Sequence, residues 1–212
     1  MLTLYDYLPS QNAYKVRLLL SHLKKPYSTK IISIFEGEGK TDEFRKISPT
    51  GAVPAIETEN GQALAESNAI LIYLAEGTQF LPKESFARAK MIQWLFFEGE
   101  VVQSGIATLR YWIQTGKDKK RDPDILQAKR LLSLSTLDIL NKELGRNQFL
   151  GGNEYTIADI ANFAYVHLSD EAKLPLQDYK NVVEWISRVK SQQGFLSKIH
   201  PYSIDPYSVG EL

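Results

Sequence analysis

The sequence predicts two joined parts, a small α/β domain at residues 1–77 and an all-helical domain at residues 86–212. Three observations support this division. Short apolar runs alternate with helical patterns over roughly the first 80 residues. An Asn-Gly pair at residues 60–61 predicts the turn of a β-hairpin. Beyond Phe86, almost every segment repeats its apolar residues at helical spacing.

The composition is that of a globular protein and gives no sign of a nucleic-acid partner. The 212 residues are 43% hydrophobic and 24% charged, and 25 basic side chains balance 25 acidic ones. A net charge of zero leaves no overall positive field to attract phosphate backbones. The densest cationic run, residues 117–121, is interrupted and followed by aspartates, which is typical of a solvated turn.

The residue types exclude several kinds of chemistry. The sequence has no cysteine, so it can form no disulfide and has no cysteine nucleophile of its own. Its histidines, His22, His167 and His200, are far apart and belong to no metal-spaced cluster, so we expect no metal site. Phosphate-loop, dinucleotide-binding and nucleophile-elbow motifs are also absent.

The sequence also predicts where the protein works. The longest apolar run, residues 69–75, is much shorter than the ~20 residues that span a bilayer, so we expect no membrane partner. The N-terminus carries Asp6 and lacks a basic start before an apolar stretch, unlike a signal peptide. We therefore expect a cytoplasmic setting.

The first domain is predicted to follow the order βαβαββα. The expected elements, in chain order, span residues 2–5, 16–23, 27–34, 42–47, 54–57, 63–65 and 67–75. Pro26 stops the first helix. A right-handed crossover between parallel strands needs a covering helix, and a hairpin supplies antiparallel strands. We therefore expect one four-stranded mixed sheet with helices on its faces.

Four helical segments are predicted in the second domain. The first is long, and its face is expected to consist of Ile92, Leu95, Phe96, Gly99, Val102, Ile106, Leu109 and Ile113. The second repeats the pattern over residues 134–144. A third begins at a capping box formed by Thr156 and Asp159, and the last spans residues 182–189. We expect an irregular tail beyond Gly194, in which residues 202–212 either cover a cleft or lie on the surface.

A polar loop precedes the first helix of the α/β domain and carries Ser10 and Asn12. Because a helix N-terminus presents unpaired N–H groups and a positive dipole end, it stabilises an anion or thiolate placed there. The Ser10 hydroxyl can donate one further hydrogen bond. The alternative is that Ser10 or Asn12 only caps the helix.

Two further loops carry features that a ligand can use. A cis peptide before Pro54 would turn the Val53 peptide outward, where it can pair with an extended ligand. Ser67 lies at a predicted helix N-terminus that suits a ligand carboxylate, and Glu66 offers an anion to a ligand ammonium group. An ordinary capped helix explains the same residues.

Taken together, the three loops resemble those of a cytosolic glutathione S-transferase. The pattern consists of Ser10 before the first helix, Val53-Pro54, Glu66-Ser67 and, much later, Gly152 with Thr156 to Ile160. It covers essentially the whole chain and is similar to bacterial members with a serine or asparagine in the site and no active-site cysteine. The resemblance implies a thioredoxin-like N-terminal domain, an all-helical C-terminal domain and a homodimer, with the fourth helix at the interface.

The resemblance also implies how glutathione, as co-substrate, is held. The Val53 backbone would pair with the cysteinyl part of glutathione, and Pro54 would be cis. Glu66 and Ser67 would hold the γ-glutamyl end. Lys40, or the backbone beside it, would lie near the glycyl carboxylate.

On the same analogy, Ser10 or Asn12 activates the thiol, with Tyr7 as a rival. The implied activity is conjugation of glutathione to small hydrophobic electrophiles, as in detoxification. Arg110 and Tyr111 on the long helix would line the second-substrate cleft. Glutathione-dependent peroxidase, disulfide reductase or isomerase activity would use the same site. A non-catalytic protein-interaction module remains the other alternative, because one fold hosts unrelated functions.

Overall fold

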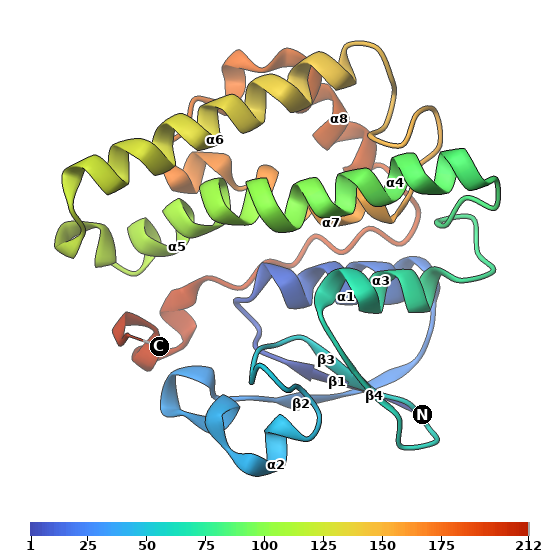
Figure 1. Cartoon of the computed structure of the whole chain (residues 1–212), viewed down its shortest axis with the longest axis vertical. Helices are drawn as coiled ribbons and strands as arrows, with labels where there is room; N and C mark the ends of the chain where they lie inside the picture. Colours follow the sequence, from blue (N-terminus) through green and yellow to red (C-terminus); the bar gives the residue numbers. More distant parts are fainter. Residues whose placement is uncertain (212) are drawn as a thin grey trace. The chain divides into compact units, whose positions relative to one another are not determined.

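The computed structural model describes residues 1–211 and divides into two compact units (Figure 1). The first unit comprises Met1–Glu76 together with the segment that begins at Gln193. The second comprises Gly77–Gln192. The sequence places all of residues 86–212 in the helical part, whereas the structure packs the segment after Gln192 with the first unit.

A four-stranded mixed sheet forms the centre of the first unit, as predicted. Its strands are β1 (Leu2–Asp6), β2 (Tyr27–Ile31), β3 (Ala55–Glu57) and β4 (Ala63–Ala65). The strand order is β2-β1-β3-β4, with β1 parallel to β2 and antiparallel to β3. The strand predicted over residues 27–34 ends three residues early, because the Ser33 N–H donates to the Glu38 carboxylate at 2.8 Å instead of extending the ladder.

Three helices complete the fold of the first unit: α1 (Gln11–His22), α2 (Asp42–Arg45) and α3 (Ser67–Ala75). Helix α1 is buried over most of its length, including the apolar run Leu18–Leu20. On the other side of the sheet, Phe44 of α2 packs in a small core with Tyr5, Tyr7 and Ile32.

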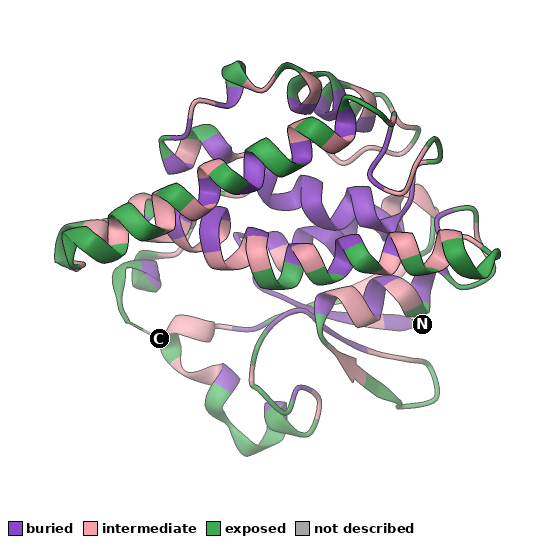
Figure 2. Ribbon diagram, turned by 45° about the horizontal axis from the view of Figure 1, so that its top comes forward, coloured by how far each residue is buried: buried purple, intermediate pink, exposed green. Residues whose placement is uncertain are grey.

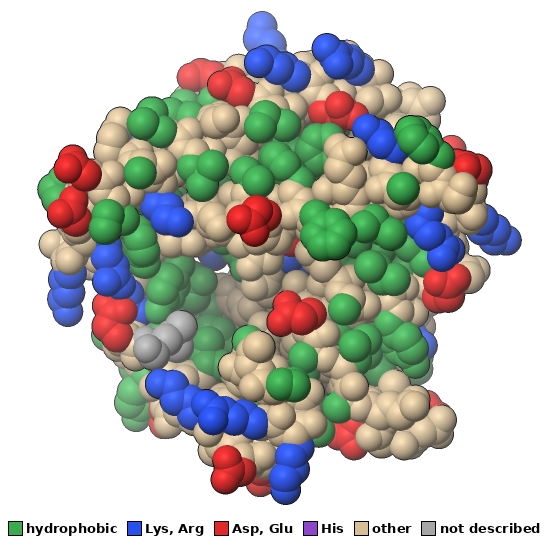
Figure 3. Space-filling view, in the orientation of Figure 1, with side chains coloured by type: hydrophobic (Ala, Val, Ile, Leu, Met, Phe, Trp, Pro, Cys, Tyr) green, Lys and Arg blue, Asp and Glu red, His purple; other side chains and the backbone are tan. Residues whose placement is uncertain are grey.

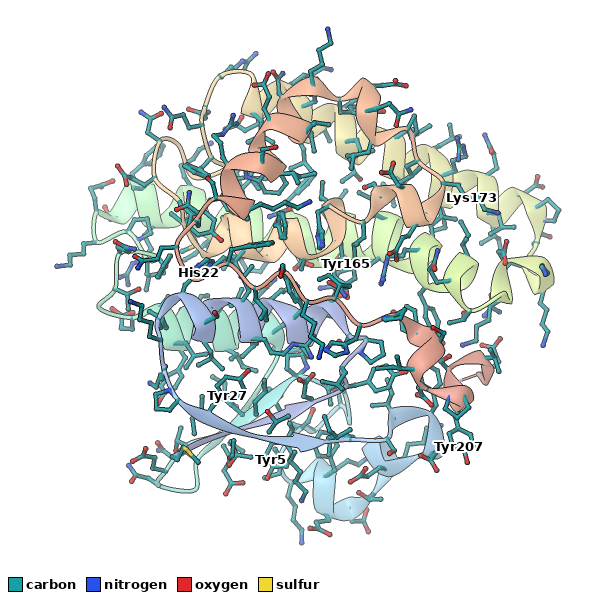
Figure 4. All side chains as sticks on the ribbon, turned by 180° about the vertical axis from the view of Figure 1, so that it is seen from behind. Tyr5, His22, Tyr27, Tyr165, Lys173 and Tyr207 are labelled. Carbon is teal, nitrogen blue, oxygen red and sulfur yellow. The ribbon has the colours of Figure 1, made fainter. Side chains whose placement is uncertain are left out.

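The C-terminal tail is attached to α1 by polar contacts. The Tyr14 hydroxyl donates to the Leu196 carbonyl at 2.7 Å, and the Ser21 hydroxyl donates to the Gly194 carbonyl at 2.7 Å. His22, labelled in Figure 4, has its Nδ1 2.8 Å from the Gln193 carbonyl. These bonds explain why the tail belongs to the first unit and not to the helices that precede it in sequence.

The second unit is helical, as predicted. Its α-helices are α4 (Ser85–Phe97), α5 (Thr108–Gln114), α6 (Pro123–Leu144), α7 (Ile157–Val166) and α8 (Lys180–Lys190). A π-helical stretch, Glu98–Ala107, joins α4 to α5 where the sequence predicts one long helix. The prediction of Phe96 on the buried face is wrong, because Phe96 is 74% exposed. The buried residues of this part of the helix are Met91, Trp94, Leu95 and Glu98.

Helix α7 forms the buried centre of the helical unit, because all ten of its residues are buried (Figure 2). The predicted capping box is present at its start. The Asp159 carboxylate accepts hydrogen bonds from the backbone N–H groups of Thr156 and Leu150 and from the Trp185 indole, at 2.9–3.0 Å. Burial raises the pKa of Asp159 to about 6, although these donors oppose the rise.

None of the helices among residues 1–211 has the length and apolarity needed to cross a bilayer.

The contribution of His167 to the stability of the folded protein should fall as the pH drops from about 6.5 to about 4, whereas the raised pKa of Asp159 acts in the opposite direction. His167 stacks on Phe163 with 4.2 Å between ring centroids, and burial lowers its pKa to about 4 from a model-peptide value of 6.5. In this window only the unfolded chain binds a proton at His167, which favours unfolding by up to about 3 kcal/mol. Urea denaturation at several pH values should show a smaller loss for His167→Gln. Equal losses in both proteins would contradict this.

Candidate functional site

The register of the sheet brings the three polar loops of the sequence to one edge. Tyr5 of β1 pairs with Ala55 of β3, which pairs with Ala65 of β4. The chain therefore leaves or enters these three strands at the same edge, through Asp6, Pro54 and Glu66. Adjacent strands lie about 4.8 Å apart, so β1 and β4 are separated by about 10 Å. Three extended residues span about the same length.

Ser10 caps α1. Its Oγ accepts a hydrogen bond from the Ala13 N–H at 3.2 Å, so the capping role considered from the sequence is present. A hydroxyl that accepts through its oxygen still carries a hydrogen to donate. Asn12 lies in the first turn of α1, which contains no acidic side chain. The positive end of the helix dipole is therefore not neutralised by its own residues.

A buried ion pair fixes the loop between β1 and Ser10. Arg17 of α1 donates to the Asp6 carboxylate and to the Leu8 carbonyl, each at 2.9 Å. Burial raises the pKa of Asp6, and the neighbouring Arg17 opposes that rise. The residue before the loop and the middle of the loop are thus bonded to the helix that follows.

The Val53–Pro54 peptide is cis, as the resemblance implies. Val53 precedes the first ladder pair of β3, so its peptide groups lie outside the β1–β3 ladder. Just before it, Gly51 has a left-handed φ of +71° and lies against the Gly39 backbone so closely that neither position has room for a Cβ. This contact holds the backbone of Gly39, which precedes the exposed Lys40, against Gly51, two residues before Val53.

The start of α3 combines an unusual backbone with a buried lysine. Glu66 is exposed and has a φ of +70°, a region that non-glycine residues occupy mostly in turns and functional sites. The next residue, Ser67, is only 7% exposed, and its Oγ accepts a hydrogen bond from the Lys15 ammonium at 3.3 Å. Sequence analysis missed Lys15. The available signal was its position four residues before Leu19, on an apolar face of α1.

A cavity of about 260 Å³ adjoins the β1–α1 loop within the first unit. Its walls come from the end of β1 with the loop, from the segment after β2, and from the tail: Tyr7, Leu8, Pro9, Ile31, Ile32, Ser33, Phe35, Glu36, Ile204, Asp205, Pro206 and Tyr207. Figure 4 shows Tyr207 on the tail beside the segment that follows β2. The cavity is mainly apolar, so it suits a small hydrophobic molecule.

Tyr7, the rival for thiol activation, is bonded to the tail. Its hydroxyl donates to the Asp205 carboxylate at 2.7 Å. Asp205 also accepts from the Tyr207 backbone N–H at 2.9 Å, which fixes the carboxylate. The hydrogen of the Tyr7 hydroxyl is therefore directed at the tail in this structure.

The residues predicted to line the second-substrate cleft, Arg110 and Tyr111, lie in the helical unit. Arg110 is 1% exposed, and its guanidinium binds the Glu171 carboxylate with two nitrogens, each at 2.7 Å. The Tyr111 hydroxyl accepts a hydrogen bond from the buried Lys117. Their role toward a second substrate stays a prediction.

In the part of the chain that the structure describes, no three acidic or histidine side chains group as metal ligands.

Comparison with known proteins identifies the family. The family description "Glutathione S-transferase, N-terminal domain" matches residues 9–76, and "Glutathione S-transferase, C-terminal domain" matches residues 102–193. The chain belongs to the glutathione S-transferase family. The predicted fold, a thioredoxin-like domain followed by a helical domain, is therefore confirmed for this transferase-family member.

Individual relatives agree with this assignment. A glutathione S-transferase from Pseudomonas fluorescens Pf-5 has 36% sequence identity and a TM-score of 0.88, over 92% of this chain and 97% of that one. Another family member from the same organism, solved with two glutathione bound, has 29% identity and a TM-score of 0.81, over 91% and 89% of the chains. The disulfide-bond oxidoreductase YfcG of Escherichia coli is 30% identical, over 91% of each chain.

Replacing Gly51 with alanine should destabilise the protein by about 3 kcal/mol. A Cβ at this position would overlap the Gly39 carbonyl, and the left-handed backbone adds its own cost. Gly61→Ala is the matched control, because Gly61 has a φ of +74° and no atom within 4 Å of a Cβ. It should lose only about 1–2 kcal/mol in urea denaturation. If both variants lose the same amount, the Gly39–Gly51 contact does not hold the loop.

Proposed function

We propose that this chain binds glutathione, stabilises its thiolate and transfers it to a small hydrophobic electrophile. The observation that carries the proposal is the meeting of three loops at one sheet edge, argued from the pairing of Tyr5, Ala55 and Ala65. The separation of about 10 Å between β1 and β4 at this edge matches the length of an extended tripeptide. We place this activity in the cytoplasm, where the glutathione pool is reducing.

The ends of glutathione have complementary groups along this edge. Ser67 and the N-terminus of α3 suit the carboxylate of the γ-glutamyl residue, and the exposed Glu66 suits its ammonium group. Val53, outside the ladder, can pair its backbone with the cysteinyl residue. Lys40 offers a positive charge to the glycyl carboxylate. The cysteinyl thiol then lies toward the start of α1.

The start of α1 can supply the free energy that thiol ionisation needs. A cysteine thiol has a pKa of about 8.5, and lowering it by about two units corresponds to roughly 2.7 kcal/mol. A charge-assisted hydrogen bond from Ser10 contributes about 1.5–3 kcal/mol, and the helix N-terminus about 0.3–1 kcal/mol. Asn12 is a second candidate donor. Tyr7 is a weaker one, because its hydroxyl already donates to Asp205.

The apolar cavity beside the β1–α1 loop gives the electrophile a place near Ser10. In the transfer, the thiolate sulfur forms a bond to the electrophilic carbon, and the leaving group departs with its bonding electron pair. No residue of the protein changes its covalent state. That Arg110 and Tyr111 line a second-substrate site stays a prediction from the resemblance.

Disulfide reduction is the second candidate, favoured by the name of the relative from Escherichia coli. The chain has no cysteine, so two glutathione molecules must supply both electrons. The first thiolate attacks the disulfide, forming a mixed disulfide and releasing one thiol. The second thiolate attacks the mixed disulfide, which yields glutathione disulfide and the second thiol.

Calorimetric titration with glutathione at neutral pH tests the shared binding step. We expect saturable binding with one γ-glutamyl site per chain. Turnover of 1-chloro-2,4-dinitrobenzene would then indicate conjugation, whereas turnover of bis(2-hydroxyethyl) disulfide would indicate reduction. No binding up to millimolar glutathione would overturn both candidates and favour an interaction module.

The Ser10→Ala variant should lose roughly 10- to 100-fold in kcat/KM, because one charge-assisted hydrogen bond to the thiolate is removed. The pKa seen in the pH profile of kcat/KM should rise toward that of a free thiol. Ser10→Thr keeps the hydroxyl and should retain most activity. If Ser10→Ala has no effect, Asn12→Ala and then Tyr7→Phe test the remaining donors.

A homodimer through α4 is also part of the proposal. Phe86 and Phe96 of α4 are 72% and 74% exposed, and Figure 3 shows hydrophobic side chains among charged ones on the face over α4. A contiguous exposed apolar patch often marks an interface. Light scattering should give about twice the 24.1 kDa of one chain. Phe96→Glu should reduce this to one chain, whereas Ile139→Glu, on the exposed face of α6, should not.

A further inference from the structure

A lysine buried in the first unit is hydrogen-bonded to a residue of the predicted γ-glutamyl subsite. Lys15 of α1 is 0% exposed, and its ammonium donates to the Ser67 hydroxyl oxygen at 3.3 Å. Ser67 is the first residue of α3 and is itself only 7% exposed. Thus a buried positive charge lies directly behind the one hydroxyl at the start of this helix.

The direction of this hydrogen bond decides what Ser67 can do. An ammonium group has three donors and no acceptor, so Ser67 must accept from it. The hydroxyl hydrogen of Ser67 is therefore left to point away from Lys15. The first backbone N–H groups of α3 have no partner within the helix. Both kinds of donor suit a negatively charged ligand group.

The neighbouring Glu66 adds a negative charge to the subsite. Glu66 is exposed and itself adopts a left-handed backbone directly after β4. A buried cation behind Ser67 and an exposed anion at Glu66 together match the carboxylate and the ammonium of an α-amino acid. The γ-glutamyl residue of glutathione ends in this pair of groups.

We infer that Lys15 is a positioning residue that selects ligands with a free α-carboxylate. It holds Ser67 as a donor toward that carboxylate and adds a positive charge behind it, without touching the ligand. This inference rests on the proposed function, because it concerns one end of the proposed glutathione site. Lys15 would thus contribute to specificity although it is buried behind the residues that contact the ligand.

The test compares two ligands on two proteins by calorimetry. The ligands are glutathione and its analogue with 4-aminobutanoyl in place of γ-glutamyl, which lacks only the α-carboxylate. Lys15→Met should bind glutathione at least tenfold more weakly than the unmodified chain. Both proteins should bind the analogue equally. A merely structural role for Lys15 would weaken both ligands alike.

Two further variants separate positioning from folding. Lys117→Met removes another buried lysine, 2% exposed, in the helical unit, and should leave glutathione affinity unchanged. In a Ser67→Ala background, Lys15→Met should cause little additional loss, because its effect acts through Ser67. If Lys15→Met does not fold, Lys15→Gln replaces it; its amide can still donate to Ser67, so a smaller, still glutathione-specific loss is expected.

The outcomes are distinct. If the unmodified chain does not bind glutathione, the proposed function fails and this inference fails with it. If the unmodified chain binds glutathione but the Lys15 variants bind it equally well, only the inference is overturned. The same holds if the variants lose affinity for both ligands to the same extent.

Discussion

Most residues of helix α1 are buried, and this burial determines how the first unit is organised. A buried polar group costs free energy unless it is hydrogen-bonded. The helix carries Tyr14, Lys15 and Arg17 among its buried residues, and each bonds to a different neighbour. Arg17 bonds to the β1–α1 loop, Lys15 to the start of α3, and Tyr14 to the tail. One helix thereby fixes three segments that are far apart in sequence.

This arrangement matters for chemistry because the proposed site is assembled from those same segments. Electrostatic stabilisation of a thiolate is effective when its donors are already in place before the reaction. Ser10 caps a helix that packing prevents from shifting, and Ser67 is held from behind by Lys15. The hydroxyl groups proposed to bind glutathione are thus held in fixed positions by their buried neighbours.

Local signals in the sequence predicted much of this architecture. The Asn-Gly turn, the apolar spacing along α6 and the capping box at Thr156 and Asp159 depend on neighbouring residues, and each has its counterpart in the structure. The Lys15–Ser67 and Tyr7–Asp205 bonds join residues 52 and 198 positions apart, and no periodicity encodes such pairs. The sequence predicts Phe96 on the buried face because its spacing from other apolar residues is helical, but the buried face is shifted by one residue toward Trp94 and Leu95.

The attachment of the tail makes the first unit discontinuous in the chain, with consequences for biosynthesis. A ribosome makes β1 to α3 first and then residues 77–192, which takes on the order of 10 s at typical rates of elongation. Throughout that interval the tail residues that line the cavity have not been synthesised, so the wall formed by Leu8, Ile32 and Phe35 lacks the wall opposite it. The nascent unit is therefore an incomplete domain with an open apolar wall, a surface of the kind that chaperones bind.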